Sequence, residues 1–104
     1  MEHSTPRVNS ALLPKYVGRT VRLTCKIIKL QGETAIVKAP DEGQVTVKLT
    51  MDSNISDDFV DIIGKVEDAN TIKMYRSSNW GSNVDLDLVN KTIEEIHRLT
   101  DWFN

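Results

Sequence analysis

The sequence predicts an all-β domain, in which five short strands close into a Greek-key barrel, followed by one long amphipathic α-helix. Three observations lead to this prediction. The chain of 104 residues is long enough for one small domain. Between residues 19 and 76, apolar side chains alternate with polar ones in five short runs separated by turn-forming residues. Beyond residue 84 the apolar period changes from two to 3.6.

The first predicted strand begins at residue 19 and is the longest. Its inward face is formed by alternate residues, Val21, Leu23, Cys25 and Ile27. Its outward face is formed by the residues between them, Arg22, Thr24, Lys26 and Ile28. A strand of this length can bend and serve both sides of a closed sheet. Because Cys25 is on the inward face, it is expected to be buried and to behave as a small hydrophobic residue.

Four shorter strands follow. Residues 34–39 and 44–49 form a predicted hairpin, because the Pro, Asp and Gly of residues 40–43 favour a turn. Residues 59–66 and 71–75 form the last two strands on either side of an acidic turn at 67–70. Five strands fit a barrel of the oligonucleotide/oligosaccharide-binding (OB) type better than a sandwich, which usually needs about seven. Residues 1–18 are expected to be an extension that packs on this barrel, which spans residues 19–76.

A Ser/Asn/Gly linker at residues 77–83 leads into a predicted helix at 84–104, with Asp85 as its N-cap. The apolar side chains of the helix sweep about 200° of its circumference, roughly twice what packing on one side requires. One part should therefore pack on the barrel and another part on a partner protein. The candidate interface residues are Leu86, Val89, Ile93, Ile96, Leu99, Thr100 and Phe103.

The charge pattern predicts only weak direct contact with nucleic acid. A net charge of −2 and a pI near 5.6 argue against a domain that binds mainly phosphate. The second and third strands also lack the aromatic platforms on which bases stack. Basic residues do gather in residues 1–32, which contain six Lys and Arg residues but only one acidic residue, Glu2. The candidate contacts are Arg22, Lys26, Lys38 and Lys48, although charged strand exteriors also simply keep a barrel soluble.

Other functional classes find no support in the sequence. No nucleophile is paired with a base, and no Cys and His spacing suits zinc, so we expect neither an enzyme nor a metal or other cofactor. A calcium-like segment at residues 52–63 lacks the glycine and the final glutamate that a calcium loop requires. No apolar run approaches the ~20 residues of a membrane span, and no small-molecule substrate is indicated. The lone Cys25 fits a reducing compartment.

Three stretches of the sequence carry a likeness to a known family. They are residues 7–13 with 16–18 and Val21, residues 59–66, and residues 85–90 followed by Ile96 and His97. In this order they resemble the smallest subunit of replication protein A, the eukaryotic heterotrimer that binds single-stranded DNA. The resemblance implies an OB fold whose C-terminal helix joins one helix from each of two larger subunits in a parallel three-helix bundle.

The resemblance also implies a nuclear, non-enzymatic and chiefly architectural role in DNA replication, repair and recombination. Its partners would be the middle subunit and the C-terminal part of the largest subunit, and DNA would be bound mainly through the complex. Two alternatives stay open: a stand-alone OB module that itself binds single-stranded nucleic acid, and a small OB adaptor of a telomere-capping trimer. The wide apolar surface of the helix favours an assembly subunit over a free module, because a monomer should not expose it.

Overall fold

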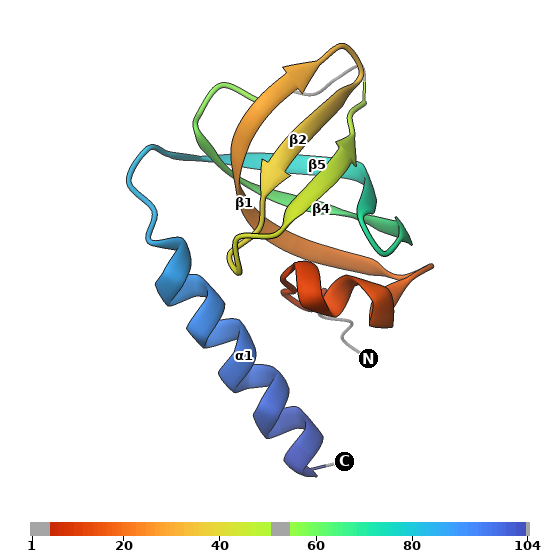
Figure 1. Cartoon of the computed structure of the whole chain (residues 1–104), viewed down its shortest axis with the longest axis vertical. Helices are drawn as coiled ribbons and strands as arrows, with labels where there is room; N and C mark the ends of the chain where they lie inside the picture. The colour runs from red at the N-terminus through yellow and green to blue at the C-terminus, as the bar shows by residue number, and fades with distance from the viewer. Residues whose placement is uncertain (1–4, 51–54, 104) are drawn as a thin grey trace.

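A computed structural model describes residues 5–50 and 55–103 of the chain and confirms the predicted barrel and helix. The strands are β1 (Thr20–Gln31), β2 (Thr34–Lys38), β3 (Gln44–Lys48), β4 (Phe59–Asp68) and β5 (Thr71–Gly81). They close into a barrel in the order β1-β2-β3-β5-β4 (Figure 1). Every neighbouring pair is antiparallel except β3 and β5, which run parallel. This order is that of a Greek-key OB barrel.

The long strand β1 serves two sides of the barrel, as its length predicts. Its first half, from Thr20 to Lys26, pairs with β4, and its second half, from Lys26 to Gln31, pairs with β2. The register shifts between Ile27 and Lys29, shortly after β1 changes partners. Because an extra residue on one strand bends it and increases its twist, this shift helps β1 to curl around the closed sheet.

The barrel interior is filled mainly by valine, isoleucine and leucine side chains. Leu23, Val37, Val47, Ile62 and Ile72 are fully buried there. Cys25 is fully buried as well, with its Sγ 3.7 Å from the carbonyl oxygen of Val60. Burial, with a smaller contribution from the charge of Asp61, raises the pKa of the Cys25 thiol, which makes it unreactive, as its inward position predicts.

The N-terminal extension packs against the barrel and contributes to its core. It contains the 3-10 helix η1 (Ser10–Tyr16), which the sequence pattern did not predict. Val8 and Leu13 are both fully buried in the barrel core. Asp41, in the turn between β2 and β3, accepts hydrogen bonds from the backbone N–H groups of Ser10 and Ala11 and from the Ser10 hydroxyl. The extension is thereby tied to two separate parts of the barrel.

Strand β5 is six residues longer than the sequence predicts. The expected linker at residues 77–83 is strand as far as Gly81, so the connection to the helix is correspondingly shorter. Ser and Asn residues have poor strand propensity, but β4 offers a partner along this whole length: Ile62, Asp61 and Val60 pair with Ser77, Ser78 and Asn79. Tertiary pairing therefore overrides local propensity in this segment.

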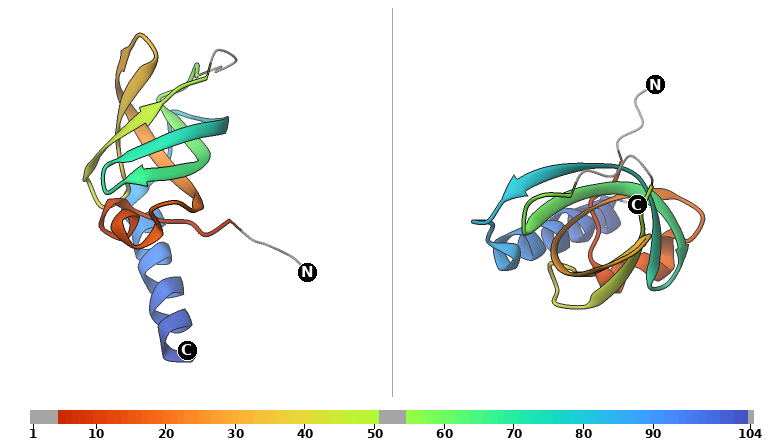
Figure 2. Two further views of the ribbon diagram at one scale, coloured as in Figure 1. Left: turned by 90° about the vertical axis from the view of Figure 1, so that its right-hand side faces the viewer. Right: turned by 90° about the horizontal axis from the view of Figure 1, so that it is seen from above.

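The C-terminal helix α1 (Leu86–Phe103) is present as predicted. Its N-cap is Asp85, whose carboxylate accepts a hydrogen bond of 3.1 Å from the Leu88 N–H. The helix starts beside the barrel and projects away from it, so that its C-terminal half lies well below the strands (Figures 1 and 2). Such a projecting helix cannot bury its whole apolar surface on its own barrel.

Candidate functional site

One side of α1 is held against the N-terminal extension by a small joint with both polar and apolar contacts. The Asn9 side-chain amide donates a hydrogen bond of 2.7 Å to the side-chain oxygen of Asn90. The His97 ring nitrogen Nε2 lies 2.9 Å from the carbonyl oxygen of Arg7, and its ring meets that of Tyr16 edge to face at 6.0 Å. Between these two contacts lies Ile93, which is 1% exposed.

The burial of Ile93 corrects one part of the predicted interface. Ile93 was expected to face a partner, but it lies within the chain, between the two hydrogen-bonded positions of the joint. Leu86 and Val89, also predicted to face a partner, are half-buried. The side chains of Thr100 and Phe103 lie outside the described part of the structure. Some apolar residues of α1 are therefore buried within the chain itself, and others are exposed to solvent.

A second side of α1 exposes large apolar side chains to solvent. Leu88 is 61% exposed, Ile96 50% and Leu99 46%. At 100° per residue these three positions fall within about 80° of the helical wheel, so they form one continuous stripe, which we call the exposed apolar stripe. Of its members, Ile96 and Leu99 were predicted interface residues. Leu88 was not among them.

A cavity of about 210 Å³ adjoins the stripe where α1 passes the end of β5. Its lining is mainly apolar and includes Trp80, Leu88, Val89 and Ile93. The Arg7 guanidinium lies 5.5 Å from the centre of the Trp80 ring, at the edge of this cavity. The first turns of the helix are thus not packed tightly against the barrel at this point.

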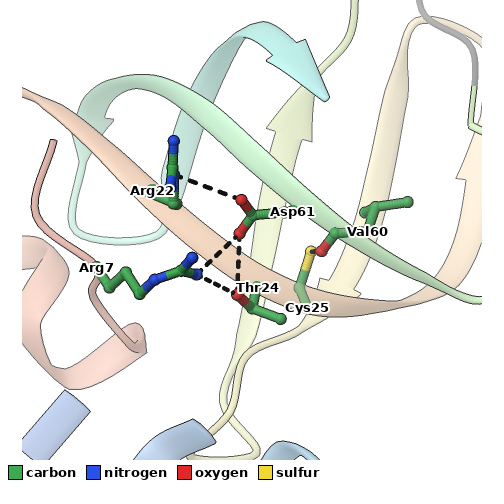
Figure 3. Close-up of polar contacts among 6 residues, drawn as sticks. All are labelled: Arg7, Arg22, Thr24, Cys25, Val60 and Asp61. Carbon is green, nitrogen blue, oxygen red and sulfur yellow. Dashed lines mark hydrogen bonds and ion pairs between the residues drawn. The ribbon is translucent and has the colours of Figure 1, made fainter. Parts of the chain in front are cut away.

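Arg7 also belongs to a polar cluster on the outer surface of β1 and β4 (Figure 3). The Asp61 carboxylate lies 3.3 Å from the Arg7 Nη1 and 3.4 Å from the Arg22 Nε, and it accepts a hydrogen bond of 2.9 Å from Thr24. Thr24 was expected to face solvent but is 1% exposed, because Arg7 covers it and hydrogen-bonds to its hydroxyl. The strand alternation is right, but the extension lies over this part of the outer face.

The four predicted nucleic-acid contacts do not form a single site. Arg22 is half-buried in the Asp61 cluster, whereas Lys26 is exposed and lies 5.9 Å from the Phe59 ring. Lys38 and Lys48 are on β2 and β3, the strands that bind ligands in OB folds.

Both lysines of β2 and β3 are partly neutralised by acidic neighbours. The Nζ of Lys38 is 3.8 Å from the Glu42 carboxylate, and the Nζ of Lys48 is 2.7 Å from that of Glu67. The hydrogen bond and charge of Glu67 raise the pKa of Lys48, so this lysine is held in its charged, paired form. In the described structure the usual OB ligand face thus offers little uncompensated positive charge.

Other kinds of site are not found in the described part of the chain. No three His, Cys, Asp or Glu side chains among the described residues come close enough to hold a metal ion. None of the described helices has the length and hydropathy needed to cross a membrane.

Comparisons with known proteins agree on one family. A family model described as Replication factor A protein 3 matches residues 1–103. Replication factor A protein 3 of Schizosaccharomyces pombe is 28% identical over 104 residues, which cover 99% of this chain and 98% of that protein. A 14 kDa subunit of replication protein A from Arabidopsis thaliana is 31% identical over 93 residues, which cover 88% of this chain and 87% of that protein.

Solved structures show the same likeness. A chain in the structure of U. maydis replication protein A bound to single-stranded DNA superposes with a TM-score of 0.91 at 34% identity, covering 100% of this chain and 99% of that chain. The telomere capping protein Ten1 from Schizosaccharomyces pombe superposes with a TM-score of 0.74 at 11% identity, covering 91% of this chain and 99% of that one. At such low identity the second likeness shows the fold alone.

The polar residues of the joint were not singled out as functional by sequence reasoning, although Ile93, which lies between them, was a predicted interface residue. Arg7, Asn9, Asn90 and His97 nevertheless all lie within the two terminal stretches that carry the family resemblance. The structure brings these two stretches into direct contact across more than 80 positions of sequence. A signal was therefore present, but a single sequence does not reveal which of its segments touch.

Proposed function

We propose that this chain, which belongs to the Replication factor A protein 3 family, is the assembly subunit of a replication protein A heterotrimer. Its role in this proposal is to hold the larger subunits together, and the complex as a whole binds and protects single-stranded DNA. The place of action is the nucleus, in DNA replication, repair and recombination. The chain itself performs no catalysis in this proposal.

The observation that carries the proposal is the exposed apolar stripe of Leu88, Ile96 and Leu99. A soluble monomer gains nothing from presenting three large apolar side chains in one line on a projecting helix, whereas a partner helix would remove them from water. Charged residues flank the stripe, such as Lys91, which pairs with Asp87. An apolar seam between charged edges is typical of a helix that packs in a bundle.

The proposed partners are the middle subunit and the C-terminal part of the largest subunit, each giving one helix to a parallel three-helix bundle with α1. The direction of α1 supports this arrangement, because the helix leaves the barrel and most of its length is accessible from several sides (Figure 2). The joint supports it too, since the hydrogen bond from Asn9 to Asn90 holds one side of the helix against the N-terminal extension and leaves the exposed apolar stripe accessible.

The barrel has a secondary role in this proposal, since DNA is bound mainly by the complex. Strands β2 and β3 lack aromatic side chains, and their two lysines are paired with glutamates. Base stacking and uncompensated positive charge are the main sources of affinity for single strands. The isolated chain should therefore bind an oligonucleotide only weakly at physiological salt.

Deletion of residues 84–104 tests the proposal. The truncated chain should remain folded, because the barrel core is built from residues before the helix, but it should no longer co-purify with the two larger subunits after co-expression. Lys48→Glu is the matched control, because it changes the barrel surface and should leave assembly intact. If the truncated chain still co-purifies, or if the full-length chain is monomeric and does not associate with either subunit, assembly through α1 is wrong.

A further inference from the structure

Three positive charges without an acidic partner among the described residues gather on the outer surface of β4 and β5, away from the strands that usually bind ligands in OB folds. Lys65 on β4 and Lys73 on β5 are directly opposite each other in the antiparallel ladder, and both are exposed. Arg76 follows on β5, opposite Ile63, and is exposed as well. We call the surface formed by Lys65, Lys73, Tyr75 and Arg76 the β4–β5 basic face.

None of these three cations forms an ion pair with any described residue, in contrast to Arg22, Lys38 and Lys48, each of which lies beside a carboxylate. The nearest acidic side chains along β4 are already engaged. Glu67 pairs with Lys48, and Asp68 accepts a hydrogen bond of 2.9 Å from the Asn70 N–H in its own turn. Hydrogen bonds within that turn lower the pKa of Asp68 and keep it an acceptor there.

Two like charges directly opposite each other on neighbouring strands repel, because their side chains start only about 5 Å apart. An anion placed between Lys65 and Lys73 would remove this repulsion. Lys48 on β3 is opposite Lys73 on its other side, but it pairs with Glu67 and so is not part of the β4–β5 basic face.

An exposed aromatic side chain lies within this set of cations. Tyr75 is 53% exposed and is the extra residue where the β4–β5 register shifts, between Met74 opposite Gly64 and Arg76 opposite Ile63. Tyr75 therefore lies between two regular ladder positions, directly before Arg76. Cations beside an exposed aromatic ring are what a single-stranded nucleic acid needs, since the cations bind phosphates and the ring stacks on a base.

We propose that the β4–β5 basic face binds the sugar-phosphate backbone of single-stranded DNA as it passes the assembled complex, with Tyr75 as a stacking platform for one base. This inference rests on the proposed function, because the single strand is the polymer that the complex supplies. It moves the contact from Arg22, Lys38 and Lys48, each paired with a carboxylate, to cations that no described carboxylate neutralises. An acidic protein segment would meet the same charges but has no need of the aromatic ring.

Titration of the full-length, isotope-labelled chain with a short oligothymidine, followed by NMR at low salt, tests the inference residue by residue. Amide shifts should concentrate at Lys65, Lys73, Tyr75 and Arg76, and not at Lys38 or Lys48. This measurement detects weak binding and does not require partners, so its failure is distinct from a failure of assembly. Shifts confined to β2 and β3, or no shifts at all, would overturn the inference.

Charge reversal provides the second readout, in the co-expressed complex. The triple variant Lys65→Glu, Lys73→Glu, Arg76→Glu should weaken oligothymidine binding at least about tenfold and reduce its salt slope by about 2, since each lost phosphate contact on a single strand contributes about 0.7. Lys15→Glu combined with Lys29→Glu is the control, because both side chains are exposed elsewhere on the surface. An unchanged salt slope in the triple variant would overturn the inference.

A milder variant and a titration with a different polymer complete the test. If the triple variant does not fold, the milder Lys65→Gln, Lys73→Gln variant should still reduce the slope by about 1.4. Titration of the chain with an acidic polyglutamate peptide separates the two kinds of polymer. Shifts from the peptide that equal those from the oligothymidine, with no contribution from Tyr75, would assign the face to a protein and overturn the DNA assignment.

Discussion

Replacing Ile96 with aspartate should abolish assembly while leaving the free chain folded. Ile96 lies on the exposed apolar stripe, is 50% exposed and is not part of the barrel core, so the substitution leaves that core intact. In a bundle the same position would be buried against a partner helix, and a carboxylate there would lose its water without gaining a counter-charge. Comparison with Ile96→Ala separates the loss of apolar contact from the cost of buried charge.

The size of each effect follows from the exposed fraction. Full burial of an isoleucine side chain contributes about 1.5 to 3 kcal/mol, and half of this remains to be gained when a partner covers the exposed half of Ile96. Ile96→Ala should therefore weaken assembly by about 1 kcal/mol, or roughly fivefold to tenfold. Ile96→Asp adds the desolvation of an unpaired charge, which costs several kcal/mol, so the loss should exceed about 100-fold.

Association can be measured by titration of the larger subunits, or their helices, with the purified chain, and helix content by circular dichroism. The matched control is Arg98→Gln, which makes the same change in net charge at an exposed position about 200° around the helix from Ile96. Helix content should be equal in all four proteins. Equal losses for the alanine and aspartate variants, or full assembly of the aspartate variant, would refute burial of this stripe.

Two further predictions concern the barrel. Gly64→Ala should lower the free energy of unfolding by about 2 to 3 kcal/mol in urea titrations, because the added Cβ would lie 2.3 Å from the carbonyl oxygen of Lys73. The control is Gly32→Ala, which has open space around the added Cβ and only a positive φ of 61° to disturb, so it should cost about 1 kcal/mol. Equal losses for the two variants would contradict this reasoning. For Asp41, burial opposes ionisation, but hydrogen bonds from Ser10 and neighbouring backbone N–H groups outweigh it and lower the pKa. The stabilisation from the ionised Asp41 is therefore present above the ordinary carboxyl pKa of about 3.9 and is lost as the pH falls through the lowered pKa. Asp41→Ala should destabilise the chain by about 1 kcal/mol at neutral pH and by less in acid. A loss of stability that does not change with pH would refute this role of Asp41.

The sequence predicts the strands well wherever burial on one side dictates alternation. The run from Val21 to Cys25 is an example, since each inward residue is fully buried. Prediction fails where a segment is determined by its partner. Ser77 and Ser78 have no preference for a strand, yet they pair with Ile62 and Asp61 of β4, which lie beyond the expected end of the last strand at residue 75.

The functional surfaces were predictable to a lesser degree. Helical periodicity shows that α1 has more apolar surface than its own barrel can cover. It does not show which apolar residues pack on the barrel and which remain exposed, and Ile93 is one of those that the chain itself buries. The β4–β5 basic face was missed for a related reason. Lys65 and Lys73 are separated in sequence by an acidic turn, and only the ladder register places them opposite each other. Information of this kind depends on pairing between segments, which no local pattern contains.

The joint between barrel and helix explains how a small domain can expose an apolar helix in a defined direction. A wide apolar joint would hold α1 firmly but would consume the residues that a partner needs, and apolar contacts alone tolerate sliding. The two hydrogen-bonded contacts, of Asn90 with Asn9 and of His97 with the Arg7 backbone, are directional and leave Leu88 and Leu99 in solvent. Asn9, which is 2% exposed, also accepts a hydrogen bond from the Leu12 N–H at the start of η1. One side chain thereby links the orientation of the helix to the packing of the extension on the barrel.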